Sequence, residues 1–158
     1  MIMELTISVK GTKYSVEDKK GRNIYTVKKK GFGAGKFVLL DASNYHLYSL
    51  IQRGDERKPT FSVTHDDRAF LEISCKSLFL DPTLDITGKE ESYKLASKDH
   101  RDFDLIKDGE VKGHVKTMMT VNGELQYEFE IDNKIFDDYL VLFVVAVDRT
   151  FGEMNKAK

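Results

Sequence analysis

A run of nine apolar residues, YLVLFVVAV from Tyr139 to Val147, is the feature that most restricts how this chain of 158 residues can fold. A helix that spans a membrane needs about 20 consecutive apolar residues. Two aspartates precede the run, and Asp148 and Arg149 follow it. The run is therefore too short to cross a bilayer, and we expect it to lie in the core of the protein.

Most of the remaining sequence alternates between apolar and polar residues, with the two-residue period of a β-strand. Leu5, Ile7 and Val9 share one face of a first strand, and QYEFEI repeats the pattern near the C-terminus. Between them, pairs of strands joined by a polar turn recur at intervals of roughly 23 residues. Four hairpins are clear: KYSVEDKKGRNIYTVKKK, KFVLLDASNYHLYSLIQR, TFSVTHDDRAFLEISCK and DFDLIKDGEVKGHVKTM. A weaker fifth hairpin is LDITGKEESYKLA.

These segments add up to about twelve short antiparallel strands, which would curl, split into two sheets or close into a barrel. A closed barrel of this size has a wide interior, and the side chains of its strands alone would leave a void. We expect the apolar run to fill that void. The sequence thus predicts a mainly β (α+β) fold, an antiparallel barrel of about twelve strands that encloses a central hydrophobic C-terminal helix.

Residues 133–151 carry the end signals of a helix. Asp132 or Asn133 can act as an N-cap, Arg149 lies in the last turn, and Gly152 can end the helix. Successive residues of a helix are rotated by about 100°, so nine consecutive apolar residues cover every side of it. A helix that is apolar on all sides belongs in a core. A buried strand is the alternative, because the run is rich in β-branched valine. Its length and its end signals favour the helix.

The chain resembles the LURP-one-related proteins in its hairpins YSVEDKKGRNIYTVKKKGF and FVLLDASNYHLYSLI, in its PTFSV, LDITG and G-x-x-x-G-H-V-K segments, and in its closing Y-x-F-E-I and LVLFVVAVDRTF. The resemblance runs from Leu5 to Phe151. These proteins form one superfamily with the tubby C-terminal domain and the phospholipid scramblases. Membership implies a twelve-stranded barrel around a central, hydrophobic C-terminal helix.

The roles known in that superfamily differ, from phosphoinositide binding by tubby domains to the lipid translocation ascribed to scramblases. This chain has neither the palmitoylatable cysteine cluster of the scramblases nor their membrane-spanning segment outside the barrel. The resemblance therefore does not imply lipid translocation. No motif here matches the phosphoinositide-binding residues of tubby, so the resemblance implies no site residue.

Charge and cysteine content exclude several classes of protein. With 25 basic and 26 acidic residues, the chain lacks the positive excess of a dedicated nucleic-acid-binding protein. The N-terminal segment shows no secretory signal, and the one cysteine, Cys75, cannot form an internal disulfide. We therefore expect a cytoplasmic protein with no nucleic-acid partner.

Residue types that serve catalysis or metal binding show no useful spacing. The histidines are scattered without an H-x-x-x-H pattern, and no Ser, His and Asp set stands out. Turn chemistry explains the THDD segment from Thr64 to Asp67. Cys75 alternates with Leu71 and Ile73, which predicts a buried structural thiol. We expect no catalytic residue, no metal and no cofactor.

The segment KKKGFGAGK, residues 28–36, is the candidate binding site. Glycine lets backbone N–H groups approach an anion closely and lysine adds positive charge, although the spacing is not that of a nucleotide P-loop. The alternative is a solvated hairpin connection whose lysines discourage edge pairing. The candidate anion- or lipid-binding residues are Lys28, Lys29, Lys30, Gly31, Gly33, Gly35 and Lys36.

We expect a single barrel domain over residues 1–152 and a charged, frayed tail over residues 153–158. Two functions remain open. The first is a non-enzymatic module that binds anionic phospholipid head groups or the membrane surface, which would place the protein at the membrane periphery. The second is a protein-interaction or structural module with a protein partner. An enzyme is the third alternative.

Overall fold

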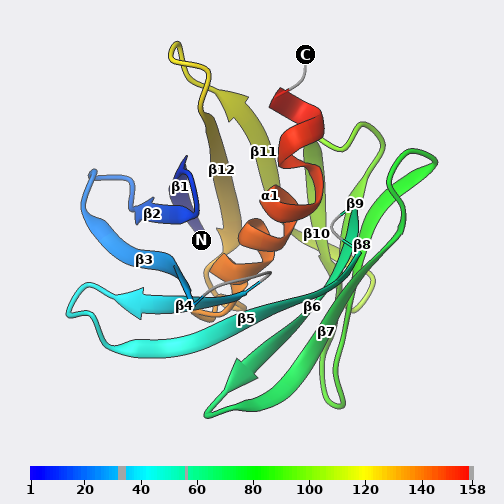
Figure 1. Cartoon of the computed structure of the whole chain (residues 1–158), viewed down its shortest axis with the longest axis horizontal. Helices are drawn as coiled ribbons and strands as arrows, with labels where there is room; N and C mark the ends of the chain where they lie inside the picture. Colours follow the sequence, from blue (N-terminus) through cyan, green and yellow to red (C-terminus); the bar gives the residue numbers. More distant parts are fainter. Residues whose placement is uncertain (32–34, 56, 157–158) are drawn as a thin grey trace.

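The computed structural model describes residues 1–31, 35–55 and 57–156. Within these ranges the chain forms twelve β-strands and one helix (Figure 1). The strands are β1 (Ile2–Lys10), β2 (Lys13–Glu17), β3 (Asn23–Lys30), β4 (Lys36–Asp41), β5 (His46–Asp55), β6 (Lys58–His65), β7 (Arg68–Ser77), β8 (Asp81–Thr87), β9 (Ser92–Ser97), β10 (Asp102–Lys107), β11 (Glu110–Met119) and β12 (Leu125–Asp132). The helix is α1 (Leu140–Lys156).

The strands form a closed antiparallel barrel. Each strand pairs with its neighbours in the sequence, and β1 also pairs with β12, where Ile7 lies opposite Tyr127. The predicted hairpins are confirmed as the pairs β2–β3, β4–β5, β6–β7, β8–β9 and β10–β11. Closure gives each of the twelve described strands a hydrogen-bonded neighbour on both sides, which removes the edges of an open sheet.

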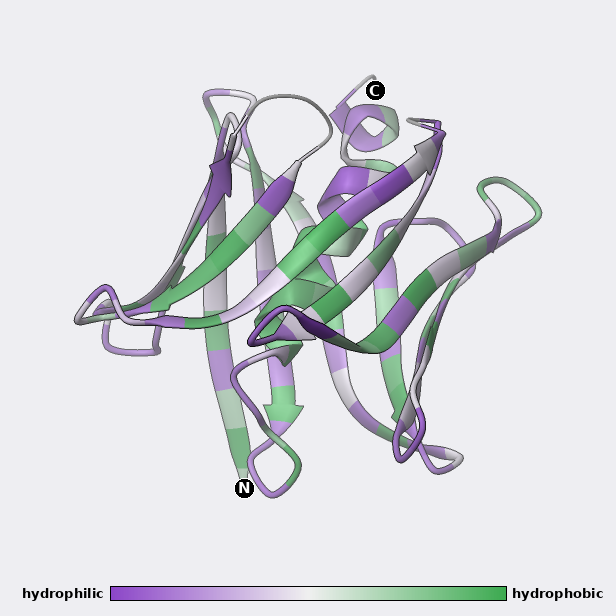
Figure 2. Cartoon of the chain, turned by 60° about the horizontal axis from the view of Figure 1, so that its bottom comes forward, coloured by the Kyte–Doolittle hydropathy of each residue, from purple (hydrophilic) through white to green (hydrophobic). Residues whose placement is uncertain are grey.

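The helix α1 fills the barrel, as the apolar run predicts. Every residue from Leu140 to Val147 is completely buried, and the ring of Phe143 packs edge-on against Tyr93 with centroids 5.1 Å apart. In Figure 2 the helix is hydrophobic where the strands surround it and more hydrophilic towards its C-terminus. The predicted barrel around a central hydrophobic helix is confirmed.

The ends of α1 differ from the prediction at both sides. Asp132 does not cap a helix, because its side chain accepts the backbone N–H of Lys134 at 2.9 Å and closes a turn. The helix begins instead at Leu140. It also continues past Gly152 to Lys156, because Asn155 is buried and donates to the backbone oxygen of His100 at 2.9 Å. The segment expected to fray is therefore helical through Lys156, and residues 157–158 lie outside the described ranges.

The antiparallel order gives the barrel two distinct ends. The connections after β1, β3, β5, β7, β9 and β11 lie where α1 ends, and we call this end the C-terminal mouth. The remaining connections and the segment 133–139 lie where α1 begins, at the N-terminal mouth. In the part of the chain that the structure describes, no helix has the length and apolarity needed to cross a bilayer.

Candidate functional site

Three exposed lysines lie side by side on the outer face of β1, β2 and β3, next to the C-terminal mouth. Lys10 is directly opposite Lys13, and Lys13 is directly opposite Lys28. The residue beside each lysine in sequence packs on the core, so strand alternation directs the lysines outward. We call these three residues the lysine row. Side chains at directly opposed positions have Cβ atoms about 4.5–5.5 Å apart, and like charges there repel each other.

The other lysines of the predicted site point in several directions. Lys30 is exposed and lies directly opposite Lys36, on the same outer face as the lysine row. Lys36 extends towards Asp67, with 3.6 Å between Nζ and Oδ1, which partly neutralises its charge. Lys29 lies opposite the buried Phe37 and is half-buried, so it faces the barrel interior near the mouth. The structure thus brings Lys28 and Lys30 together with Lys10 and Lys13.

Among the described residues, no carboxylate forms an ion pair with any member of the lysine row, or with Lys29 or Lys30. Elsewhere on the barrel, lysines do pair with acidic neighbours, such as Lys107 with Glu91 at 3.0 Å. The lysine row is therefore a local concentration of positive charge that forms no direct ion pair with a described carboxylate, although Glu124 and Glu153 lie near Gly11 in the adjacent turn.

The glycines of the predicted site have the backbone conformation that glycine favours. Gly31 and Gly35 have φ angles of 76° and 86°, in the left-handed region. The backbone oxygen of Gly35 accepts the N–H of Gln52 at 3.1 Å, which ties Gly35 to β5. Gly33 lies outside the described residues.

Sequence reasoning missed Lys10 and Lys13, because it considered only residues 28–36. The signal for them is the segment VKGTKY, in which two lysines flank a Gly-Thr turn. A tight turn places the flanking residues opposite each other across a hairpin, and pairing with the next strand then adds Lys28. The site extends across three strands, where the sequence suggested a single loop.

At the C-terminal mouth, the carboxylate of Asp148 in α1 accepts hydrogen bonds from two tyrosines. The hydroxyl of Tyr14 donates to its Oδ2 at 2.6 Å, and the hydroxyl of Tyr127 donates to its Oδ1 at 2.8 Å. Burial raises the pKa of Asp148, and these two hydrogen bonds act in the opposite direction. A Cβ atom at Gly152 would lie 2.8 Å from Oδ1, so glycine leaves room for the carboxylate. This cluster joins the helix to β2 and β12.

At the N-terminal mouth, Glu91 has the corresponding role. Its Oε2 accepts the hydroxyl of Tyr139 at 2.6 Å, and its Oε1 lies 3.0 Å from Nζ of Lys107. The hydrogen bond from Tyr139 is the main cause that lowers the pKa of Glu91. The hydroxyl of Tyr25 donates to Asp138 close by. These polar groups bind one another and hold the start of the helix in place.

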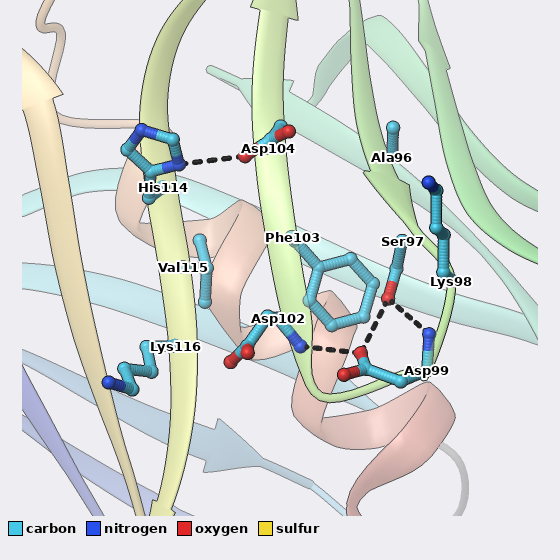
Figure 3. Close-up of a pocket in the computed structure, with 10 residues that line it drawn as sticks. All are labelled: Ala96, Ser97, Lys98, Asp99, Asp102, Phe103, Asp104, His114, Val115 and Lys116. Atoms are coloured by element: carbon cyan, nitrogen blue, oxygen red, sulfur yellow. Dashed lines mark hydrogen bonds and ion pairs between the residues drawn. The ribbon is translucent and has the colours of Figure 1, made fainter.

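A furrow of about 620 Å³ crosses the outer face of β9, β10 and β11 (Figure 3). Asp104 lies directly opposite His114, whose Nδ1 is 2.7 Å from its Oδ1. Asp99 accepts the backbone N–H groups of Arg101 and Asp102, each at 2.9 Å, and so closes a turn. Asp104 and His114 thus form a cross-strand pair and Asp99 stabilises a turn, so these three side chains have structural roles.

The remaining candidates from the sequence also have structural positions. Cys75 is 5% exposed, and burial raises the pKa of its thiol, as expected for a structural cysteine. Asp66 and Asp67 both have positive φ angles in the turn between β6 and β7, which confirms the turn interpretation of THDD. Within the described ranges, no group of three or more His, Cys, Asp or Glu residues is arranged to hold a metal ion.

The fold and its surface define a small β-barrel domain whose interior is occupied by its own helix. A family model described as LURP-one-related matches residues 1–148, and the chain belongs to this family. The resemblance seen in the sequence is thereby confirmed. An X-ray structure of a protein from Arabidopsis thaliana is similar at 15% sequence identity and a TM-score of 0.44, over 98% of this chain and 91% of that chain. No curated protein matches the chain.

Proposed function

We propose that this protein is a non-enzymatic module that binds anionic phospholipid head groups at a membrane surface. The observation that carries the proposal is the lysine row, in which Lys10, Lys13 and Lys28 are exposed, adjacent and unpaired with any described carboxylate. An anionic surface relieves the repulsion between these charges, because each ammonium group gains an opposite charge nearby.

The expected strength of this attraction is sufficient for peripheral binding. A lysine close to an anionic membrane contributes about 1 kcal/mol, so the lysine row and Lys30 together contribute a few kcal/mol. The net charge of the chain is −1, so the attraction must be local to this corner of the barrel. Exposed lysines on the outer face of a barrel also suit a membrane surface better than a small ligand, which needs a concave site.

The polar clusters inside the barrel support a binding role without catalysis. Asp148 and Glu91 are the acidic centres of the two mouths, and their partners are tyrosine hydroxyls and Lys107. A general base needs a substrate proton within hydrogen-bond reach. Both carboxylates instead accept hydrogen bonds from groups that hold the helix in place, so we assign them a structural role.

A comparison of two charge-matched variants tests the proposal. The first variant replaces Lys10, Lys13, Lys28 and Lys30 with Gln. The second replaces Lys19, Lys20, Lys89 and Lys134, four exposed lysines at the N-terminal mouth, in the same way. Co-sedimentation with vesicles that contain phosphatidylserine should be weakened at least about tenfold in the first variant and little in the second.

Equal loss in both variants would show that only total charge matters and would contradict a site at the lysine row. Retained binding in both variants would contradict it as well. Unfolding of each variant in urea serves as the control, because exposed lysines contribute little to stability and both should unfold as the wild type does. If the wild type binds no vesicles, a protein-interaction module becomes the better account.

A further inference from the structure

The tip of the β11–β12 hairpin presents an apolar side chain to solvent. Val121 is fully exposed, at 104% of its reference area, and the two residues before Thr120, Met118 and Met119, are 40% and 44% exposed. Turn positions favour Gly, Asn, Asp, Ser and Pro for conformational reasons, and none of these reasons calls for valine. The folded barrel therefore gains no packing from Val121.

The backbone holds this tip in a defined shape. The N–H of Thr120 donates to the oxygen of Glu124 at 2.8 Å, and the N–H of Gly123 donates to the oxygen of Thr120 at 3.0 Å. The hydroxyl of Thr120 accepts the N–H of Glu124 at 3.2 Å, and Gly123 has a φ angle of 80°. An ordered turn presents Val121 at low entropic cost, because little conformational freedom remains to be lost on binding.

The tip lies next to the lysine row. The strand β12 pairs with β1, where Gln126 is opposite Ser8, so the connection before β12 lies beside the β1–β2 turn that Lys10 and Lys13 flank. Figure 1 shows this connection, in yellow, projecting from the barrel at the end where the C-terminus of α1 emerges. An exposed apolar tip and unpaired positive charge thus share one side of the C-terminal mouth.

We propose that the β11–β12 tip inserts Val121 into the apolar layer of an anionic bilayer while the lysine row contacts the phosphate groups. This inference rests on the proposed function and adds a depth and an orientation to it. The lysine row supplies the charge complementarity that selects an anionic membrane over another apolar partner. Insertion of an exposed apolar side chain adds hydrophobic transfer energy that salt does not screen.

Leu80 is the competing apolar tip at the same mouth. It is 93% exposed in the β7–β8 connection, and Phe79 beside it is 76% exposed. This connection lies on another part of the rim, since β8 to β11 separate it from β12. An acidic residue, Asp81, follows Leu80 directly. The Val121 turn also contains an acidic residue, Glu124, so what favours Val121 as the inserting residue is its position beside the lysine row.

The chain contains no tryptophan, so a single introduced tryptophan reports its own surroundings. The test compares three full-length variants, Val121→Trp, Leu80→Trp and, as the control at the N-terminal mouth, Tyr45→Trp, whose position is 69% exposed. With vesicles of phosphatidylcholine and phosphatidylserine, the emission of Val121→Trp should shift to the blue and be quenched by brominated lipid. The emission of Tyr45→Trp should remain that of a solvated indole.

The outcomes separate this inference from the proposed function. If Val121→Trp co-sediments with the vesicles but its emission does not shift, insertion is wrong and electrostatic docking stands. A shift at Leu80→Trp alone would also overturn insertion through Val121. Failure of all three variants to bind would overturn both claims. A Val121→Asp variant should keep the wild-type circular dichroism and bind about tenfold more weakly, because it removes the apolar contact and adds a negative charge.

Discussion

Asp148 and Glu91 hold the two ends of the central helix, and their pKa values move in opposite directions. Burial raises the pKa of Asp148, whereas the hydrogen bond from Tyr139 lowers the pKa of Glu91. Ionisation of the largely desolvated Asp148 costs free energy, and the hydrogen bonds from its tyrosine partners reduce that cost. Ionisation of the half-buried Glu91 stabilises the folded state. The two clusters therefore predict different responses to substitution and to pH.

Tyr127→Phe should lower the free energy of unfolding by about 1–3 kcal/mol, because it removes one of the two donors to the half-buried carboxylate of Asp148. Urea denaturation at neutral pH measures the change. The matched control is Tyr45→Phe, which removes a hydroxyl from an exposed side chain and should stay within about 0.5 kcal/mol of the wild type. Equal small effects for both variants would show that the hydrogen bond from Tyr127 to Asp148 does not stabilise the fold.

Glu91→Gln should make the stability of the protein less dependent on acid pH. A lowered folded pKa means that ionised Glu91 stabilises the folded state above the unfolded value of about 4.3, and that this contribution is lost as pH falls through the folded value. The variant should be less stable than the wild type at neutral pH. The difference should shrink as the pH falls below about 4.3. A difference that stays constant with pH would contradict the pairing with Tyr139.

At the scale of elements, the sequence reveals periodic patterns well and tertiary contacts poorly. Alternation predicted the five hairpins, and the apolar run predicted the buried helix, because both patterns depend on neighbouring residues. The helix ends could not be predicted, since the last turn depends on the contact between Asn155 and His100, 55 residues apart. The lysine row was missed for a similar reason, because it is defined by register across three strands.

Phe143→Ala should lower the free energy of unfolding by about 3–5 kcal/mol, because the helix would leave a cavity at the centre of the barrel. Guanidinium denaturation followed by circular dichroism measures this loss. The control on the same helix is Glu153→Ala at an exposed position, which should change stability by less than about 0.5 kcal/mol. A small effect of Phe143→Ala would contradict the assignment of α1 as the core of the barrel.

At the scale of the whole molecule, the two mouths differ in charge although the chain has a net charge of only −1. The lysine row lies at the C-terminal mouth. The connections of the N-terminal mouth carry an acidic excess, with eight acidic residues against five basic ones. The acidic residues are Asp18, Asp66, Asp67, Glu90, Glu91, Asp108, Asp137 and Asp138, and the basic ones are Lys19, Lys20, Arg22, Lys89 and Lys134. If the proposed membrane binding holds, we expect this arrangement to turn the C-terminal mouth towards an anionic surface. Orientation thus follows from topology, because the antiparallel barrel sorts its connections between two ends.

Binding of the wild-type protein to vesicles at two salt concentrations tests the central claim most directly. We predict co-sedimentation with vesicles of phosphatidylcholine and phosphatidylserine at about 0.01 M salt and clearly weaker binding at about 0.15 M, because the Debye length falls from about 30 Å to about 8 Å. Vesicles of phosphatidylcholine alone should bind little protein at either concentration. Failure to bind the acidic vesicles at low salt, or equal binding to both kinds of vesicle, would contradict the claim that the lysine row binds an anionic membrane.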